Sequence, residues 1–141
     1  MNKLKILVVD DEPLNIEFME GILSLEYEVV KAKSGIDGLI KAEKILPDII
    51  LLDIMMPNTN GYAVCKELRT NKKTAAIPIV MVTVLDGNED KMKAIEAGAD
   101  DFMSKPIDIG ELRARVKSWL MVKRHYDNCL SSSNQHLYKV F

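Results

Sequence analysis

Residues 49–53 read IILLD, an apolar run of strand length that ends in a carboxylate, Asp53. An earlier run, ILVV at 6–9, ends in the same way with Asp10 and Asp11. The run before Asp53 is apolar at every position, which is typical of a central strand in a parallel sheet that is covered on both faces. Because parallel strands have their carboxyl ends at one edge of the sheet, we expect the three carboxylates to meet there.

Runs of this kind alternate along the chain with segments of helical periodicity, which indicates a parallel sheet with helices on both faces. The expected strands are 5–9, 27–32, 49–52, 77–82 and 101–104. The expected helices start at Pro13, run from Ser34 to Pro47, from Gly61 to Thr70 and from Asp86 to Gly98, and start again at Asp108. The partly alternating strand 27–32 is expected at the edge of the sheet.

Local signals predict where the helices begin and which faces they bury. Pro13 suits a first helical position, and N-cap spacing appears at Ser34 with Asp37, Asp86 with Glu89, and Asp108 with Glu111. The apolar positions of the five helices are Ile16, Met19, Ile22 and Leu23; Ile36, Leu39 and Ile40; Val64, Cys65 and Leu68; Met92 and Ile95; and Leu112, Val116, Trp119 and Leu120. The apolar residues of the second helix, Ile36, Leu39 and Ile40, are expected to face inward.

Five strand–helix units joined by right-handed crossovers predict a three-layer, flavodoxin-like (βα)5 sandwich. With the strands numbered along the chain, the expected order in the parallel sheet is 2-1-3-4-5. Strands one and three are then neighbours on either side of the topological switch point, where ligands bind outside the carboxyl ends of the strands. The acidic residues follow these two strands.

The composition is that of an ordinary globular domain: 141 residues, 48% apolar, 28% charged and a net charge of −2. The charge argues against a broad nucleic-acid surface, and no apolar stretch reaches the roughly 18 residues of a membrane span. No signal peptide is apparent at the N-terminus. Cys65 and Cys129 lie far apart without metal-ligand spacing, so we expect a reducing, cytoplasmic location.

The folded domain is expected to occupy residues 1–125, because the apolar pattern fades after His125. Residues 126–141 are predicted to be an extension of the last helix or a linker tail. The last helix also carries a run of basic residues, namely Arg113, Arg115, Lys117, Lys123 and Arg124. Such a run could bind nucleic acid, but it is more often a solvated face, and we favour that interpretation.

Two further polar residues follow later strands: Thr83 after 77–82, and Lys105 after 101–104. Three acids, a hydroxyl and an ammonium at one edge predict a site for a divalent cation and a phosphoryl group. Asp53 is the candidate nucleophile, and the acids would hold Mg²⁺. Without the metal, the carboxylates should repel one another and some of their pKa values should rise.

Each of these residues also has a simpler interpretation. Asp53 could cap the following loop, and Asp10 or Asp11 could cap the first helix. Thr83 could be an ordinary β-branched strand residue, and Lys105 a solvated lysine. The functional interpretation rests on all of them occurring together in this order.

With these residues in place, the chain resembles a two-component response-regulator receiver domain over about residues 4–123. The motifs that carry the resemblance are Asp10-Asp11 after the first strand, Asp53 after the third, Met56-Pro57 and Gly61 in the next loop, Thr83 after the fourth, Phe102 in the fifth, and Lys105-Pro106 after it. Any one of these motifs alone is weak evidence for the family, but the full set in this order is specific to it.

The resemblance implies roles for these residues. Asp11, Asp53 and the backbone carbonyl of Met55 would contact Mg²⁺ directly, and Asp10 would act mainly through water. Lys105, held before a cis bond to Pro106, would contact the phosphoryl group of Asp53. Thr83 would offer its hydroxyl to that group, and Phe102 would turn inward as Thr83 moves, unless it is simply a core aromatic residue. Val84, where the family has a smaller residue, would restrict that turn.

Three segments are closer still to the first receiver of PleD-like diguanylate cyclases: IILLDIMMP at 49–57, TVLDG at 83–87 and FMSKPID at 102–108. The cyclase signature itself does not occur in the sequence, so we expect a switch that hydrolyses only its own aspartyl phosphate rather than an enzyme. The resemblance implies a histidine kinase or phosphotransfer protein as phosphoryl donor. The chain is then either a free-standing receiver or part of a larger regulator with a downstream output domain. In this family the surface of the fourth helix, fifth strand and fifth helix more often carries partner or dimer contacts, and Asp100, Asp101 and Glu111 could pair with arginines across a two-fold axis of a homodimer.

Other functions are less compatible with the sequence. A receiver-like adaptor that works without phosphorylation remains an alternative, although the full set of acid, threonine and lysine argues against it. A phosphohydrolase with a nucleophilic aspartate would need an Asp-x-Asp pattern after the first strand, and residues 10–13 read DDEP. A flavin site of the flavodoxin type would need a Ser/Thr/Gly-rich loop at the same place.

Overall fold

The computed structural model describes residues 3–140, with side chains described for 3–125 and 127–129. A parallel five-stranded sheet forms its middle layer in the order β2-β1-β3-β6-β7, which confirms the predicted sandwich and strand order. These strands are β1 (Lys5–Val9), β2 (Glu28–Ala32), β3 (Ile49–Leu52), β6 (Ile79–Thr83) and β7 (Asp101–Ser104). Two short strands that were not predicted, β4 (Met55–Met56) and β5 (Thr59–Asn60), form an antiparallel hairpin in the loop after β3.

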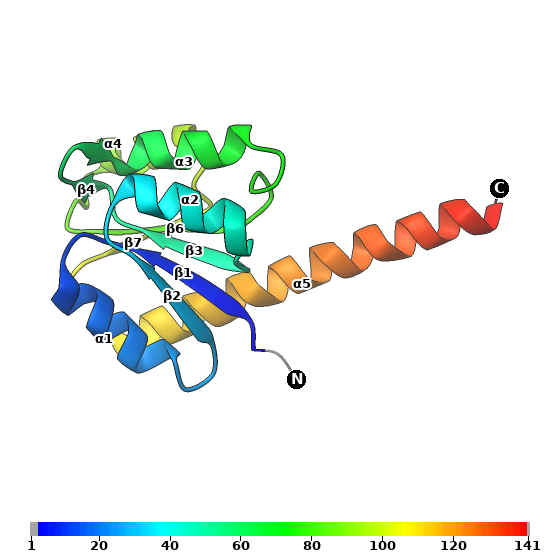
Figure 1. Cartoon of the computed structure of the whole chain (residues 1–141), viewed down its shortest axis with the longest axis horizontal. Coiled ribbons are helices and arrows are strands. Elements are labelled where there is room, and N and C mark those ends of the chain that lie inside the picture. The colour runs from blue at the N-terminus through cyan, green and yellow to red at the C-terminus, as the bar shows by residue number, and fades with distance from the viewer. Residues whose placement is uncertain (1–2, 141) are drawn as a thin grey trace.

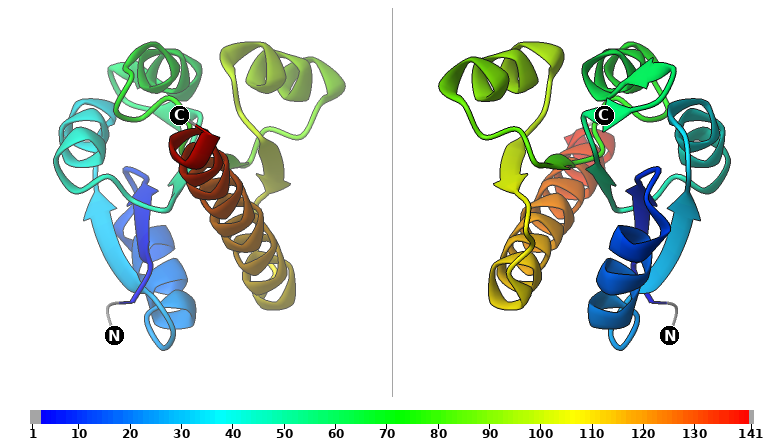
Figure 2. Two further views of the ribbon diagram at one scale, coloured as in Figure 1. Left: turned by 90° about the vertical axis from the view of Figure 1, so that its right-hand side faces the viewer. Right: turned by 90° about the vertical axis from the view of Figure 1, so that its left-hand side faces the viewer.

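Helices cover both faces of the sheet (Figures 1 and 2). One apolar cluster joins the sheet to α2, α3 and α4, and a second joins the opposite face to α1 and α5. The helices are α1 (Pro13–Leu23), α2 (Gly35–Ile45), α3 (Gly61–Thr70), α4 (Asn88–Ala97) and α5 (Ile109–Val140). The carboxyl ends of β1 and β3 therefore open between these two layers at one edge of the sheet.

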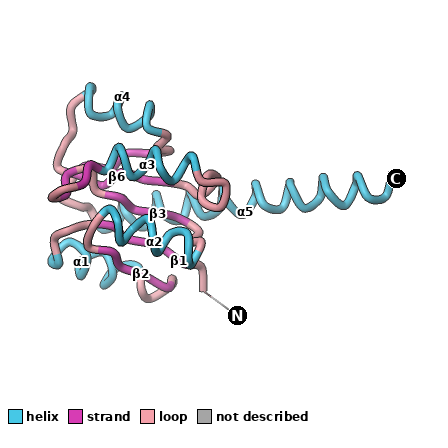
Figure 3. The backbone as a smooth tube through the Cα atoms, turned by 45° about the horizontal axis from the view of Figure 1, so that its top comes forward, coloured by secondary structure: helices cyan, strands magenta, loops and turns pink. Residues whose placement is uncertain are grey.

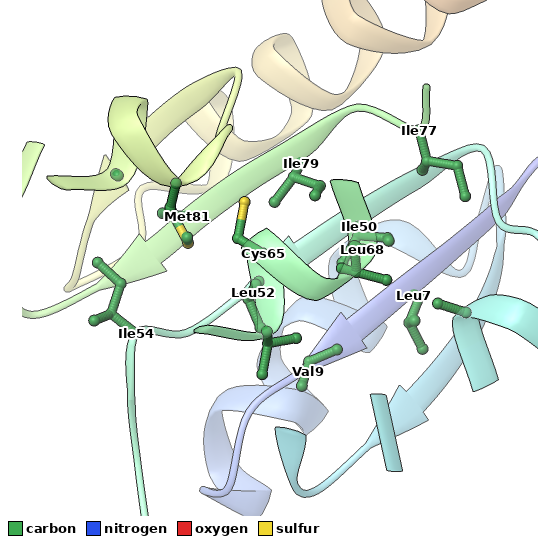
Figure 4. Close-up of a cluster of buried hydrophobic side chains, with 14 of the residues drawn as sticks. Leu7, Val9, Ile50, Leu52, Ile54, Cys65, Leu68, Ile77, Ile79 and Met81 are labelled. Carbon is green, nitrogen blue, oxygen red and sulfur yellow. The ribbon is translucent and has the colours of Figure 1, made fainter. Parts of the chain in front are cut away.

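The central strands are buried along their whole length, as their continuous apolar sequences predict. Every residue of β3 and β6 is buried, and Leu52 packs in the same cluster as Cys65 and Leu68 of α3 (Figure 4). Burial raises the pKa of the Cys65 thiol to about 11, so this side chain acts as a packing residue. The sheet edge that carries the acidic residues is thus held by an apolar core on each face of the sheet.

Two of the three predicted helix caps are present. The Ser34 hydroxyl accepts a hydrogen bond from the Asp37 amide at 3.1 Å, and the Asp108 carboxylate accepts one from the Glu111 amide at 2.8 Å. The prediction that Asp86 and Glu89 begin α4 was wrong by one residue. Gly87 precedes the helix, and its amide donates to the carboxylate of Asp90 at 3.3 Å.

The predicted inner face of α2 was wrong at two of its three residues, whereas the third, Leu39, is partly buried and packs against the core. Ile36 and Ile40 are 65% and 60% exposed, and the helix buries Gly35, Gly38 and Ala42 instead. A Cβ atom on Gly38 would lie 2.9 Å from a methyl group of Val9, so the backbone of α2 lies directly against the sheet. Only small residues fit that face, which turns the isoleucines outward.

The fourth strand of the sheet begins two residues later than predicted, at Ile79 rather than Ile77. Pro78 lacks an amide proton and contributes only its carbonyl oxygen, which accepts from the Ile50 amide at 2.9 Å.

Met92 and Ile95 of α4 are 56% and 66% exposed, and this helix buries only Ala94 and Ala97.

The last helix continues well past the sheet. Leu120 is its last buried residue among those with described side chains, and the helical backbone runs on to Val140 (Figure 1). Over residues 3–140, no helix is both long enough and apolar enough to cross a bilayer.

Candidate functional site

Three carboxylates meet where β1 and β3 end. Asp10 and Asp11 follow β1, and Asp53 follows the neighbouring strand β3. Each offers an oxygen atom, and these three atoms lie within 4.8 Å of one another. Asp10 is 1% exposed and Asp53 6% exposed, whereas Asp11 is half-buried. The convergence expected from the strand ends is therefore present.

Lys105 lies between the two most buried acids. Its ammonium nitrogen Nζ is 2.7 Å from Asp10 Oδ2 and 3.1 Å from Asp53 Oδ2, and its side chain is only 8% exposed. The backbone amide of Lys105 donates to the Thr83 carbonyl at 2.7 Å, which fixes the residue at the end of β7. The bond to Pro106 is cis. The sequence predicted Lys105 at this site but not its contact with both acids.

The second oxygen of each buried acid is held by the backbone. Asp10 Oδ1 accepts from the Glu12 amide at 3.0 Å, and Asp53 Oδ1 accepts from the Met55 amide at 3.2 Å. Both carboxylates are thereby fixed in orientation. Asp10 also stabilises the turn that leads into α1, through its bond with the Glu12 amide. It therefore has this structural role in addition to any functional one.

Burial and charge shift the pKa values of this cluster in defined directions. Burial is the largest cause of the raised pKa of Asp53; Lys105 opposes it by charge and hydrogen bond, and Asp10 adds to it. Burial alone would lower the pKa of Lys105, but its hydrogen bond to Asp10 and the charges of both acids raise it overall. The expected repulsion between carboxylates therefore exists, but desolvation contributes more.

Thr83 ends β6, the strand next to β3, and Phe102 lies on β7, the strand next to β6. Thr83 is fully buried at the end of β6, and its hydroxyl accepts weakly from the Leu85 amide at 3.5 Å. Phe102 is half-buried in β7, with the Lys91 ammonium 5.8 Å from its ring centroid. Its ring is therefore outside the fully buried core and has a cation above it.

The surface of α4, β7 and α5 carries ion pairs within the chain. Arg115 contacts Asp101 at 2.6 Å and Glu111 at 3.0 Å, and Arg69 contacts Asp100 at 2.6 Å. Burial tends to raise the pKa of Asp101, but hydrogen bonds from Trp119 and Arg115 lower it overall. These are the acids that the sequence suggested for pairing across a two-fold axis, and here their partners are internal.

One polar contact near the site was not predicted. The Tyr62 hydroxyl donates to the backbone carbonyl of Asp90 in α4 at 3.0 Å. Tyr62 also lines an open hollow of about 760 Å³ between the β4–β5 hairpin and α4. The sequence did contain a signal for this contact: Tyr62 is a tyrosine in an otherwise apolar first turn of a helix. The hydroxyl of a buried tyrosine usually needs a hydrogen-bond partner.

This fold and this cluster define the class of protein. Residues 6–117 match the family model described as the response regulator receiver domain. The chain therefore belongs to the response regulator receiver domain family.

The curated relatives that the chain matches are longer proteins. Response regulator PleD of Caulobacter vibrioides is 48% identical over 115 residues, which cover 81% of this chain and 25% of that protein. The alkaline phosphatase synthesis transcriptional regulatory protein PhoP of Bacillus subtilis is 46% identical over 121 residues, covering 85% of this chain and 49% of that protein. This chain thus spans less than half the length of either relative.

Solved receiver structures share the fold. The receiver domain of the sensor histidine kinase PA1611 from Pseudomonas aeruginosa has a magnesium ion coordinated in its active site cleft. It matches with a TM-score of 0.78 and 31% identity, over 84% of this chain and 98% of that one.

Proposed function

We propose that this chain is a phosphorylatable switch in which Asp53 accepts a phosphoryl group from a histidine kinase or phosphotransfer protein. The observation that carries the proposal is the Asp53 carboxylate itself, held beside Lys105 at 3.1 Å and within 4.8 Å of two further acids. We place the switch in the cytoplasm, because its free cysteines, Cys65 and Cys129, fit a reducing compartment. Residues 1–125 would be the switch domain, and residues 126–141 a helix extension or a linker tail.

The donor set fits Mg²⁺. Three carboxylate oxygens gathered on one side of the site are hard ligands, and Mg²⁺ prefers a few such ligands together with water. Asp11 and Asp53 would hold the ion directly with the Met55 carbonyl, and Asp10 would act through water. When bound, the ion supplies positive charge against the carboxylates and the phosphoryl oxygens. The magnesium ion in the PA1611 receiver supports this assignment by analogy.

The residues of this chain perform the transfer by position and charge. A carboxylate oxygen of Asp53 forms a bond to phosphorus as the bond from phosphorus to the donor nitrogen breaks, which yields an acyl phosphate. Lys105, already in contact with Asp53, would turn its ammonium to the oxygens of the transferred group. The Thr83 hydroxyl, which holds only a weak bond at 3.5 Å, would donate to one of these oxygens.

The output would follow from a change in the surface of α4, β7 and α5. Phe102 is half-buried and would turn inward as Thr83 moves toward the phosphoryl group. The neighbouring Val84 is 61% exposed and would limit that turn by its bulk. We propose that the altered surface promotes a homodimer or an output contact, as in a PleD-like regulator, by biasing two existing states.

Incubation with Mg²⁺ and acetyl phosphate tests the proposal directly. Intact mass should rise by about 80 Da, the mass of one phosphoryl group. The Asp53→Asn variant should show no adduct. Sedimentation with Mg²⁺ and beryllofluoride should show a shift to dimer if self-association is the output. A protein that gains no mass and does not respond to beryllofluoride would instead be the phosphorylation-independent adaptor.

The acyl phosphate should be long-lived, because the two side chains that flank the site are apolar. Met55 is 54% exposed and Leu85 is half-buried, and neither can orient an attacking water. Replacing Met55 with Asn, or Leu85 with Glu, should shorten the lifetime of the phosphoryl group by about tenfold, a modest effect for a positioned polar group. Equal decay of the adduct in wild-type protein and both variants, followed by mass spectrometry, would contradict this explanation.

A further inference from the structure

The helix α4 has little apolar anchorage. Among its residues only Ala94 and Ala97 are buried, and its two large apolar side chains, Met92 and Ile95, face solvent. It lies at the outer side of the molecule next to α3 (Figure 3). Small side chains bury little apolar area, so polar contacts carry much of the attachment of this helix.

Two side chains of α3 hold α4 near its two ends. Tyr62 donates to the carbonyl of Asp90 at 3.0 Å, and Arg69 Nε donates to the carbonyl of Gly98 at 2.8 Å. The two donors are seven positions apart, about two helical turns, and so lie on one face of α3.

The two attachments differ in strength. Arg69 also donates to the carbonyl oxygens of Ala75 and Ile77 and to Asp100, so it is fixed by several partners. The Tyr62 hydroxyl makes a single hydrogen bond to α4. The N-terminal end of α4 is therefore the end that can separate from α3, and the C-terminal end is the pivot.

Tyr62 is also connected to Asp53 through a short series of contacts. Asp53 Oδ1 accepts from the Met55 amide, and Met55 pairs with Asn60 in the β4–β5 hairpin. The Asn60 side chain then accepts from the Tyr62 amide at 2.7 Å. A group added to Asp53 would be carried by the carboxylate at the start of this series, and the last of the contacts positions the Tyr62 ring that reaches α4.

We propose that Tyr62 is a positioning residue that couples the Asp53 site to the N-terminal end of α4, by a route separate from Thr83 and Phe102. In the unmodified protein its hydroxyl holds α4 against α3. A change at Asp53 moves the hairpin, weakens the contact with Asp90 and releases the first turns of α4, while Arg69 keeps the far end in place. The coupling between Asp53 and α4 rests on the proposed function, whereas the contact between Tyr62 and Asp90 does not.

Hydrogen exchange in the free protein tests the contact. Tyr62→Phe removes one hydroxyl and keeps the ring, and should speed exchange of the α4 amides at 91–94 about fivefold, as expected for one net hydrogen bond. Amides at the start of β6 should not change. Tyr27→Phe is the matched control, because Tyr27 is also half-buried but packs against the opposite face of the sheet. Unchanged α4 exchange in Tyr62→Phe, or an equal rise in Tyr27→Phe, would overturn the proposal.

Beryllofluoride with Mg²⁺ then tests the coupling, which needs evidence beyond proximity. In the wild type it should speed exchange at 91–94, and in Tyr62→Phe the added increase should be much smaller because the contact is already absent. Thr83→Ala should leave part of the wild-type response intact if the routes are separate. Equal increases in wild type and Tyr62→Phe would overturn the coupling. A wild-type protein with no response at all would count against the proposed function, whatever the free Tyr62→Phe variant shows.

Discussion

Replacement of Lys105 with Met should lower the free energy of unfolding by about 3 kcal/mol at neutral pH, because it leaves buried carboxylates without their counter-ion. The Lys105 ammonium is the cation in contact with both Asp10 and Asp53, and all three side chains are less than a tenth exposed. Met has a similar length and preserves most of the apolar packing. Lys117→Met, at an exposed position of α5, is the control and should change stability by less than about 0.5 kcal/mol.

The loss of stability in Lys105→Met should become smaller as pH falls. Burial already raises the pKa of Asp53 above its ordinary value of 3.8, and removal of the ammonium raises it further. An acid whose folded pKa exceeds its unfolded pKa destabilises the folded state at high pH; this penalty begins to shrink as pH falls through the folded value and is gone below the unfolded value. Denaturant unfolding at several pH values should therefore show the variant approaching the wild type as pH falls toward 4.

Mg²⁺ provides a second check on the Lys105 variant. Because the ion binds the folded site, it should stabilise both proteins. The gain should be larger in Lys105→Met, where the acids have no other cation. Stability that is unaffected by the substitution, or a deficit that widens at low pH, would show that Lys105 does not balance the charge of this cluster.

Gly61→Ala should destabilise the protein by about 2 kcal/mol and impair phosphorylation, because there is no room for a Cβ atom at this position. That atom would lie 2.3 Å from the carbonyl oxygen of Asp53 and 2.5 Å from the Cα atom of Ile54, both of them backbone atoms. The Gly61 amide also donates to the Ile54 carbonyl at 2.8 Å. The first turn of α3 would have to move away from the strand that ends at Asp53.

Gly21→Ala is the matched control for this substitution. Nothing lies within 4 Å of a Cβ atom at Gly21, which is inside α1. Alanine there should stabilise the protein by about 0.5 kcal/mol, since it restricts the unfolded chain and favours helix. Opposite signs in thermal unfolding, with a lower phosphorylation rate only for Gly61→Ala, are expected. Similar effects of both substitutions would mean that the contact with Asp53 does not constrain the backbone.

The fold could be predicted from the sequence because its strongest signals are local. The strand at 49–52 is apolar throughout and ends in an acid, and the parallel arrangement alone brings Asp53 toward the acids after β1. The burial of α2 could not be obtained in this way. Helical periodicity favoured Ile36 and Ile40, but the close approach of Gly38 to Val9 decided which face turned inward.

The contacts made by long side chains were harder to predict than the positions of the acids. Lys105 reaches Asp10 across 95 positions in the sequence, and no local pattern specifies which oxygen atoms its ammonium will meet. The same holds for Tyr62, whose partner is a backbone carbonyl of Asp90. Sequence patterns thus predict which groups share an edge of the sheet, and tertiary packing determines how they are paired.

The long last helix has a mechanical consequence. From Leu120, the last buried residue among the described side chains of α5, the helical backbone extends about 30 Å to Val140 at 1.5 Å per residue. A tilt of about 5° at the base would displace the tip of such a rod by roughly 2.6 Å. The projecting part of α5 can therefore act as a lever, so that a rearrangement too small to alter the packed layers becomes a displacement large enough for an attached partner to detect.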